Sequence, residues 1–465
     1  MVALAVSLII LVFARLFWNH FCLGSIPGPL LAGISGLWRT CARNSSDYGR
    51  RLAELHQKYG KMVRVGPNAI SVSDPAVFCQ ISSACAGEKR AFLNDTMSIR
   101  SQTMPTNQIQ RPAMGETIES RFGFEEIREC EGLIDRLIVG LATAIRRHRT
   151  LDITTSFQFF AAEFVGQMVA DDNMKGTGDI LGTLASSRLS QDYTRVQTAL
   201  PMMEYLLLKS PVAKLKRDRC HDLAYASYSS QKQVSYIPSS NAGSATPGLS
   251  LFTSNTLLCG EPSFVAAGAA SLSKAFPTAF FLLMKHPTVI SKLQNEIDIA
   301  VHRGALSDPP RWVETNRLQY LDAVLKESMR HTPAMSFGLE IVVPAGGVIV
   351  DDRYIPEGTM LECHIEALRR DKTVYGEDVE LFRPERWLTT DTQHRRRMEQ
   401  ALLEFNVSRR ISPGIYVSWL ELKKAAAFII MNFDINLLTD GQHEIDAKTY
   451  DDLPPMIMNF TQRAY

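Results

Sequence analysis

The spacing of apolar and polar residues predicts a chain of mostly helices with small sheets inserted. Apolar residues recur at helical spacing over 132–147, along a longer stretch at 264–297, and again over 420–433. Two stretches have strand character instead. Residues 62–75 alternate around a glycine-proline-asparagine turn and predict a β-hairpin, and residues 341–355 are rich in valine and isoleucine.

The domain organisation follows from length and composition. The chain has 465 residues, 45% of them hydrophobic, which is enough for one large core. Residues 227–250 are rich in serine, proline and glycine and predict a loop rather than a boundary. There is no internal repeat and no dinucleotide-binding glycine loop. The fold class is therefore predicted as mainly α with small β-sheets (α+β), in a single domain over 25–465.

The first residues of the chain differ in kind from the rest. Residues 2–14 are an almost unbroken apolar run, followed by Arg15. This length is short for a membrane span unless Arg15 reaches the interface. A cleaved signal peptide is the alternative, but no basic segment precedes the run and no A-x-A site follows it. We expect a single-pass anchor over 1–24 in the endoplasmic reticulum membrane, with the rest of the chain in the cytosol. The proline-rich stretch 26–29 is expected to hold the predicted domain off the bilayer.

Charge and cysteine usage exclude several classes of protein. Fifty basic residues against forty-nine acidic ones give a net charge of +1, so nucleic acid is not an expected partner. The eight cysteines are scattered without CxxC pairs, which argues against disulfide frameworks and structural zinc. Cys363 and His364 are adjacent on a predicted strand, where their side chains point to opposite faces. No metal site is therefore expected.

Four segments in fixed order carry a family resemblance. They are ESMR at 327–330, FRPERW at 382–387, Ala267-Gly268 followed by Pro287 nineteen residues after the glycine, and FNVSRRISPG at 405–414. An ExxR match alone occurs by chance in many helices, but the four together resemble the cytochrome P450 superfamily, particularly its fungal microsomal members. The order and spacing hold from about residue 26 to 440, so the resemblance implies a cytochrome P450 fold for nearly the whole chain.

The resemblance assigns roles to two groups of residues. Glu327 and Arg330 lie at i and i+3 on one helix face and can pair. Arg386 is implied to complete a buried structural cluster with them. The implied substrate pocket is lined by a long helix that carries Ala267, Gly268, Ala270 and Ser271. Ser271 is the candidate for contact with substrate, although no catalytic residue is identified.

The ligand loop departs from the family pattern. The position of the cysteine that binds haem iron is occupied by Ser412, and two inner glycines are replaced by Asn406 and Ser408. A cysteine thiolate donates electron density to iron and favours O–O cleavage, whereas a serine hydroxyl stays protonated and is a weak ligand. Ser412 is therefore interpreted as a former haem-ligand position.

Two further haem contacts of the family are altered. The acid–hydroxyl pair that delivers protons to bound oxygen corresponds to Ala270 and Ser271, so the carboxylate is lost. A strand arginine that contacts a haem propionate corresponds to Ile341. Arg410 is the one former propionate contact that keeps its place. We therefore expect no cofactor, with haem binding disfavoured although not excluded.

Three functional hypotheses follow from these departures. The first is a cofactor-independent cyclase or isomerase of fungal secondary metabolism, such as a Diels–Alderase that closes a ring in a hydrophobic terpenoid or polyketide. The second is a monooxygenase-like haem protein in which serine or water ligates the iron. The third is a catalytically dead scaffold that binds partner biosynthetic enzymes at the membrane. The joint loss of the haem contacts favours the first, whose partners are a hydrophobic small molecule and a membrane.

Overall fold

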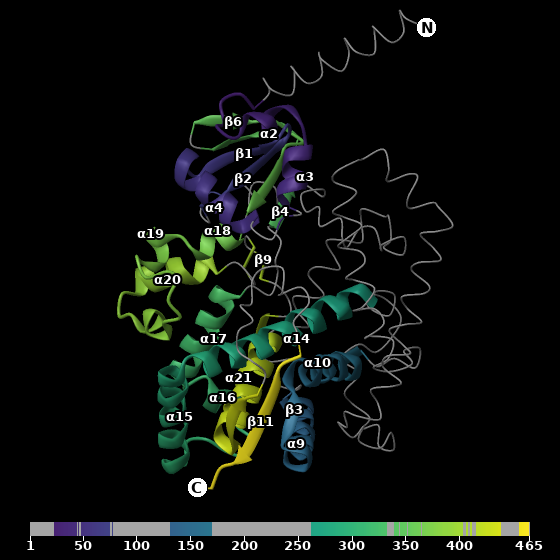
Figure 1. The fold of residues 1–465 in the computed structure, drawn as a ribbon, viewed down its shortest axis with the longest axis vertical. Coiled ribbons are helices and arrows are strands. Elements are labelled where there is room, and N and C mark those ends of the chain that lie inside the picture. The colour runs from purple at the N-terminus through teal and green to yellow at the C-terminus, as the bar shows by residue number, and fades with distance from the viewer. Residues whose placement is uncertain are drawn as a thin grey trace, which may run out of the picture.

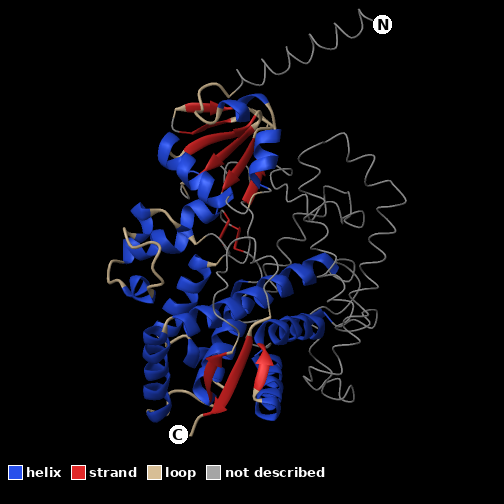
Figure 2. Ribbon diagram, viewed as in Figure 1, coloured by secondary structure: helices blue, strands red, loops and turns tan. Residues whose placement is uncertain are grey.

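The structure is a computed structural model that describes fourteen parts of the 465-residue chain. These are residues 23–43, 45, 48–74, 77, 131–169, 262–332, 339–343, 345–350, 352–363, 365–402, 406–407, 410–411, 415–438 and 455–464. Helices dominate this part of the chain and the sheets are small, so the predicted fold class is confirmed (Figure 2).

A lobe at one end of the molecule is built on a four-stranded sheet with the strand order β1-β2-β7-β4 (Figure 1). Its strands are β1 (Met62–Gly66), β2 (Ala69–Val72), β7 (Met360–Cys363) and β4 (Leu339–Val342). β2 and β7 run parallel, and the other two pairs are antiparallel. Helices α2 (Leu30–Ile34), α3 (Leu37–Arg43) and α4 (Tyr48–Tyr59) belong to this lobe, together with the hairpin of β5 (Val348–Val350) and β6 (Arg353–Ile355).

The hairpin predicted from residues 62–75 is confirmed by the pairing of β1 with β2. Both strands are buried along their whole length, including Arg64. The Arg64 side chain donates hydrogen bonds to three backbone carbonyls, of Gly33, Gly66 and Pro67, which offset the cost of burying its charge.

The proline-rich stretch after the N-terminal run is part of this lobe. The backbone N–H of Arg64 donates to the carbonyl of Pro27 at 2.8 Å. A side chain on Gly28 would collide with the backbone of Arg64, so only glycine allows this approach. This stretch is therefore fixed against the edge of β1, and the expectation that it holds the domain off a bilayer stays a prediction.

The larger helical body contains the long helices and a three-stranded sheet of order β10-β11-β3. The long helices are α9 (Glu131–His148), α10 (Ile153–Val169), α14 (Pro262–Lys285), α15 (Pro287–His302), α17 (Gln319–His331) and α21 (Ile415–Asn432). The strands are β3 (Thr150–Asp152), β10 (Phe433–Leu437) and β11 (Ile457–Gln462). The shorter elements are α16 (Trp312–Thr315), α18 (Ile365–Arg369), α19 (Lys372–Tyr375), the 3₁₀-helix η1 (Pro384–Leu388), α20 (Thr392–Ala401), β8 (Asn406–Val407) and β9 (Arg410–Ile411).

Helix α14 is shorter than the helical pattern that predicted it. The expected continuous pattern over 264–297 is divided into α14 and α15 at Pro287, whose ring occupies the first position of the second helix. Pro262 is the first residue of α14, where a proline needs no hydrogen-bond donor. Pro277 alone lies in the interior.

The core of the helical body forms where α10 and α14 pack against each other. The rings of Phe157 and Phe276 stack with centroids 3.3 Å apart, and Phe276 stacks on Phe280 at 4.4 Å. Phe276 and Phe280, both on α14, are almost fully buried. These rings therefore belong to the hydrophobic core.

No helix among the described residues is long and apolar enough to cross a membrane. The expected anchor over 1–24 lies almost wholly outside the described residues, so that prediction stands untested. The predicted loop over 227–250 also lies outside them.

Candidate functional site

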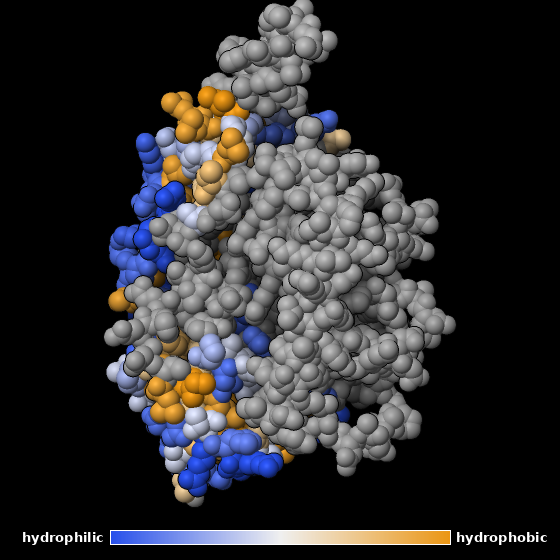
Figure 3. Space-filling view, turned by 45° about the vertical axis from the view of Figure 1, so that its right-hand side comes forward, coloured by the Kyte–Doolittle hydropathy of each residue, from blue (hydrophilic) through white to orange (hydrophobic). Residues whose placement is uncertain are grey.

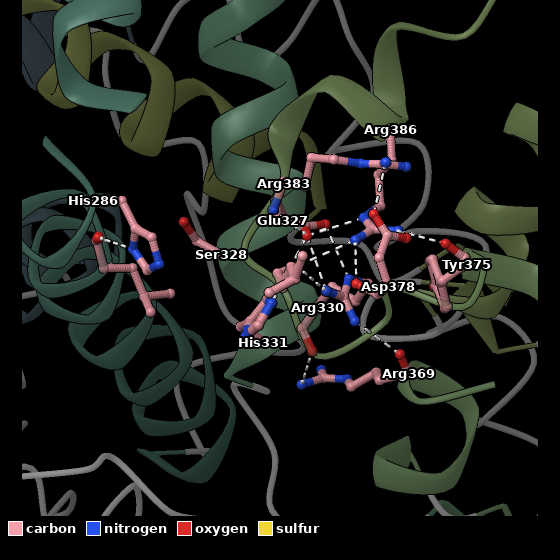
Figure 4. A network of polar contacts seen from close by, with 12 residues as sticks. His286, Glu327, Ser328, Arg330, His331, Arg369, Tyr375, Asp378, Arg383 and Arg386 are labelled. Carbon is pink, nitrogen blue, oxygen red and sulfur yellow. Dashed lines mark hydrogen bonds and ion pairs between the residues drawn. The ribbon is translucent and has the colours of Figure 1, made fainter. Parts of the chain in front are cut away.

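A buried carboxylate lies at the centre of the best-defined polar site. Glu327, on α17, is fully buried and accepts five hydrogen bonds (Figure 4). Its Oε1 atom accepts from Arg330 Nη2 at 2.9 Å, Arg386 Nε at 3.0 Å and the backbone N–H of Arg383 at 2.9 Å. Its Oε2 atom accepts from Arg330 Nε and Trp387 Nε1, both at 2.9 Å. The structure thus brings together Glu327, Arg330 and Arg386, the residues expected to form a cluster.

Two different local structures supply the arginines. Helix α17 places Arg330 one turn after Glu327 on the same face. Arg386 comes from η1, which begins at Pro384 and turns Arg386 and Trp387 toward the core. Sequence reasoning did not identify Trp387 as a donor to Glu327.

The remaining guanidinium donors bind backbone carbonyls. Arg330 donates to the carbonyls of Arg369 and Leu381. Arg386 donates to those of Tyr375, Asp378 and Leu381, and also to the Asp378 carboxylate at 3.2 Å. The cluster therefore ties α17 to the chain that leads from α18 through α19 into η1.

The electrostatics of the cluster keep Glu327 ionised. Burial alone would raise the pKa of its carboxyl group. The hydrogen bonds and positive charge of Arg330, the charge of Arg386 and the backbone N–H of Arg383 outweigh burial and lower that pKa. A buried anion is stable here because its acceptor sites are filled by charged or polar donors.

His331 borders the cluster and differs from it in charge. Burial, and the positive charge of Arg330, lower the pKa of His331 to about 4. Its ring meets Phe382 edge-on with centroids 5.5 Å apart. Although its Nε2 atom lies 3.8 Å from Glu327, the lowered pKa means that His331 is neutral near pH 7 and forms no ion pair.

The expected pocket residues are placed only in part. Ala267, Gly268, Ala270 and Ser271 all lie on α14, as expected, but the structure describes only their backbone. Whether they line one pocket is therefore still a prediction.

The former ligand loop is also described in part. Ser412 lies outside the described residues, between β9 and α21. β8 and β9 form a short antiparallel pair in which Val407 faces Arg410 and Asn406 faces Ile411. Only the backbone of Arg410 is described. Ile341 lies on β4, paired with Leu361 of β7, and again only its backbone is described.

The distribution of cysteines limits what can bind haem iron. The sequence contains no cysteine after Cys363. Cys363 lies on β7 in the apolar cluster of the sheet lobe, fully buried with Leu23, Ile70 and Leu361. The loop that leads into α21 therefore offers a serine hydroxyl where the resemblance places a thiolate. This donor does not fit haem-thiolate ligation. Among the described residues, no group of side chains forms a metal site.

Helix α21, which follows this loop, carries three buried charged residues that sequence reasoning missed. Lys424 is fully buried and pairs with Glu131 at 2.6 Å and Asp135 at 2.7 Å on α9. Lys423 pairs with Asp322 of α17 at 2.6 Å.

Glu421 is buried, and neither of its carboxyl oxygens has a hydrogen-bond partner among the described residues. Burial therefore raises the pKa of Glu421 well above its usual value. The sequence feature that could have revealed these residues is the charged segment ELKK at 421–424, which lies inside an otherwise apolar helix.

Comparison with known proteins settles the family. The family model described as cytochrome P450 matches residues 208–454, slightly more than half of the chain. The chain belongs to the cytochrome P450 family. This P450-family protein is 27% identical to "Cytochrome P450 monooxygenase mfmA" of Annulohypoxylon moriforme, over 96% of this chain and 93% of the relative. It is 28% identical to "Cytochrome P450 monooxygenase esdpH" of Penicillium shearii, over 92% of each chain. A monooxygenase of Aspergillus terreus is 26% identical over 94% of this chain and 95% of its own.

The comparisons confirm the expected superfamily and its fold. They also support a place among fungal secondary-metabolism P450 proteins. The relatives are named monooxygenases and not cyclases, so they do not support the non-oxidative hypothesis.

Replacing Arg386 should destabilise the P450-family protein strongly. Arg386→Ala removes one of the two guanidinium groups that neutralise Glu327 and leaves the carbonyls of Tyr375 and Leu381 with fewer donors. The expected loss of unfolding free energy is roughly 3–5 kcal/mol, measured by chemical denaturation. Arg383→Ala is the matched control, because the Arg383 side chain is half exposed in its pair with Asp378 and should cost at most about 1 kcal/mol. Equal losses in the two variants would contradict a structural role for the buried cluster.

Stability should also depend on the protonation of His331. The unfolded chain takes up a proton at a pKa of 6.5, whereas the folded chain does so only near pH 4. The His331 contribution is therefore complete above pH 6.5 and is lost as pH falls from 6.5 to 4, by roughly 3 kcal/mol in total.

The measurement is the unfolding free energy of wild type and His331→Phe at a series of pH values in this window. His331→Phe should flatten the slope, and His302→Phe at the exposed end of α15 is the control. An unchanged slope in His331→Phe would show that the histidine is not kept neutral in the folded protein.

Proposed function

We propose that this P450-family protein is a cyclase or isomerase of fungal secondary metabolism that acts without haem-thiolate chemistry. The substrate would be a hydrophobic terpenoid or polyketide, and the reaction a pericyclic ring closure of the Diels–Alder type. One observation carries the proposal. The Glu327–Arg330–Arg386 cluster that stabilises the fold is complete, while the chain has no cysteine after Cys363.

The contrast between fold and chemistry supports this proposal. A P450 monooxygenase needs a thiolate ligand to cleave dioxygen. Here Ser412 and Ala270 occupy the positions at which the family resemblance places the thiolate and the oxygen-side acid. The complete cluster supports a stable folded domain, because each buried charge in it has a partner of opposite charge.

A pericyclic ring closure suits such an interior because all of its bond changes take place within the substrate. In a Diels–Alder step a diene and an alkene form two carbon–carbon σ bonds at the expense of two π bonds. No electron, proton or leaving group passes to the protein. The pocket needs only to hold the substrate in a near-attack conformation, which lowers the entropic part of the barrier. A hydroxyl such as that of Ser271 can donate a hydrogen bond to a carbonyl on the alkene partner and stabilise the developing charge.

A second candidate function comes from the relatives. Because they are named monooxygenases, the alternative is a haem protein with serine or water as the iron ligand. A scaffold without turnover, which binds other biosynthetic enzymes, is the third possibility.

In each case we place the protein at the endoplasmic reticulum membrane, with an anchor over 1–24 and the domain in the cytosol.

The first expected result concerns haem content. Protein purified from haem-supplemented cells should carry far less than one haem per chain, because Ser412 offers no thiolate. The measurement is the ratio of the Soret absorbance to protein, with a cysteine-bearing relative expressed in parallel. A stoichiometric Soret band would favour the haem-protein alternative, and a thiolate-type band of the reduced CO complex would overturn the assignment of Ser412.

The second expected result concerns turnover. The protein should convert a hydrophobic precursor into an isomer of identical mass under nitrogen, without NADPH or reductase. Gly268→Leu should abolish this activity by filling the expected groove on α14. Ser412→Ala should leave the rate within about twofold, because the proposed step uses no ligand at that position. Product formation is followed by chromatography and mass spectrometry. A product heavier by one oxygen atom would show that the protein is a monooxygenase. An absence of turnover would favour the scaffold hypothesis.

A further inference from the structure

Glu421, in the second turn of α21, lies in an apolar part of the core. It is 2% exposed, and neither of its carboxyl oxygens has a hydrogen-bond partner among the described residues. Ala425 and Phe428 follow it on the same face of α21 and belong to the main hydrophobic cluster. A buried acid without donors costs folding free energy, so its surroundings are the opposite of those of Glu327.

The elements around α21 carry titratable side chains, but these do not balance the charge of Glu421. Helix α21 packs against α9, α14, α15, α16, α17 and β10. Their titratable side chains include Glu131 and Asp135 on α9, Lys274 on α14, Glu296 on α15, Glu314 on α16, Asp322 on α17 and Asp434 on β10. Burial is nevertheless the only cause of the raised pKa of Glu421.

The two lysines that follow Glu421 are held by other helices. Lys423 binds Asp322 of α17, and Lys424, which is fully buried, binds Glu131 and Asp135 of α9. Lys424 lies at i+3 from Glu421, the spacing that places two side chains side by side on a helix, whereas i+2 does not. Lys424 can therefore reach Glu421, provided that it leaves α9.

The acids of α9 can lose Lys424 at a moderate cost because they reach water. The side chains of Glu131 and Asp135 are 20% and 31% exposed. They belong to the helical body, and Figure 3 shows hydrophilic side chains gathered over this lower end of the molecule. Burial raises the pKa of Asp135 despite the attraction of Lys424, so its ion pair is weakly held. Glu421, in contrast, is enclosed by the core.

We propose that Glu421 and Lys424 form a proton-operated switch between α21 and α9. While Glu421 is protonated, Lys424 binds Glu131 and Asp135 and holds the two helices together. When Glu421 releases its proton to the solvent, the carboxylate draws Lys424 away from α9 into an i,i+3 pair on α21. The contact of α9 with α21 then loosens in the first turns of the helix that follows the Ser412 loop. This switch is independent of the proposed reaction.

The pH window of the switch follows from the pKa of Glu421. The unfolded chain releases this proton at the usual pKa of 4.5, whereas the folded chain does so only well above it. The contribution of Glu421 to stability is therefore complete below pH 4.5 and is lost as pH rises through the folded pKa. His331 acts in the opposite direction between pH 6.5 and 4, so measurements above pH 6.5 isolate Glu421.

Chemical denaturation of the full chain in detergent, from pH 6.5 upward, tests the titration. The unfolding equilibrium constant of wild type, relative to that of Glu421→Gln, should rise about tenfold per pH unit until the folded pKa is reached. Glu421→Met is the second variant and should give the same flat profile at higher stability, since it buries no polar group. Glu54→Gln, at an exposed site on α4, is the matched control and should follow wild type.

Hydrogen exchange followed by mass spectrometry reports on the switch itself. Over the same pH range, wild type should lose protection in α9 and in the first half of α21 by about tenfold beyond the intrinsic effect of pH. Glu421→Gln should keep this protection. Helix α4, in the sheet lobe, is the internal reference and should exchange equally in both proteins.

Two results would overturn the proposal. A wild-type stability profile parallel to that of Glu421→Gln would show that the carboxyl group does not titrate in this window. An equal loss of protection in α4 and α9 would show a general loss of stability without a local switch. Neither measurement uses substrate or haem, so their outcome is separate from that of the isomerisation assay.

Discussion

The interaction on which the described structure most depends is the neutralisation of Glu327 in the core. A fully buried carboxylate is tolerated only when every acceptor site is filled, and here two arginines, one tryptophan and one backbone N–H supply the donors. Because Arg330 and Arg386 also hold the carbonyls of Arg369, Tyr375 and Leu381, the segment between α18 and η1 cannot move without leaving charges unpaired. The segment that leads through α20 to the former ligand loop starts from this fixed point.

Helix α21 follows that loop in the sequence and is itself held in place by buried ion pairs. Lys423 and Lys424 point to different neighbours, α17 and α9, and each pairs with an acidic side chain there. In the sequence, the loop that carries Ser412 thus lies between a segment held by the Glu327 ion pairs and a helix held by the ion pairs of Lys423 and Lys424. Glu421 contrasts with both lysines, because its buried carboxyl group lacks a partner among the described residues and its pKa is raised, which favours the neutral form.

These interactions separate what holds the fold from what performs chemistry. The Glu327 cluster holds together α17, η1 and the chain between α18 and η1 through contacts among protein groups alone. Fold alone therefore does not assign the reaction. Under the proposed function, the chemistry depends on a few positions, above all Ser412 and Ala270, where the family resemblance places the iron ligand and the oxygen-side acid.

The sequence by itself determined the features that depend on local spacing. The β1–β2 hairpin, helix α9 and the pairing of Glu327 with Arg330 follow from alternation, helical period and an i,i+3 interval, which neighbouring residues set among themselves. The place of Arg386 beside Glu327, 59 residues away, came from family resemblance and not from spacing.

Only tertiary structure decided the contacts between distant segments. Lys424 meets Glu131 across 293 positions, β11 pairs with β3, and Pro27 is fixed against Arg64. It also decided which face of α2 is exposed: Ala32 and Gly33 are buried, whereas Leu31 and Ile34 are exposed. A hydrophobic pattern shows that a leucine favours burial, but only the neighbouring backbone decides whether there is room for it.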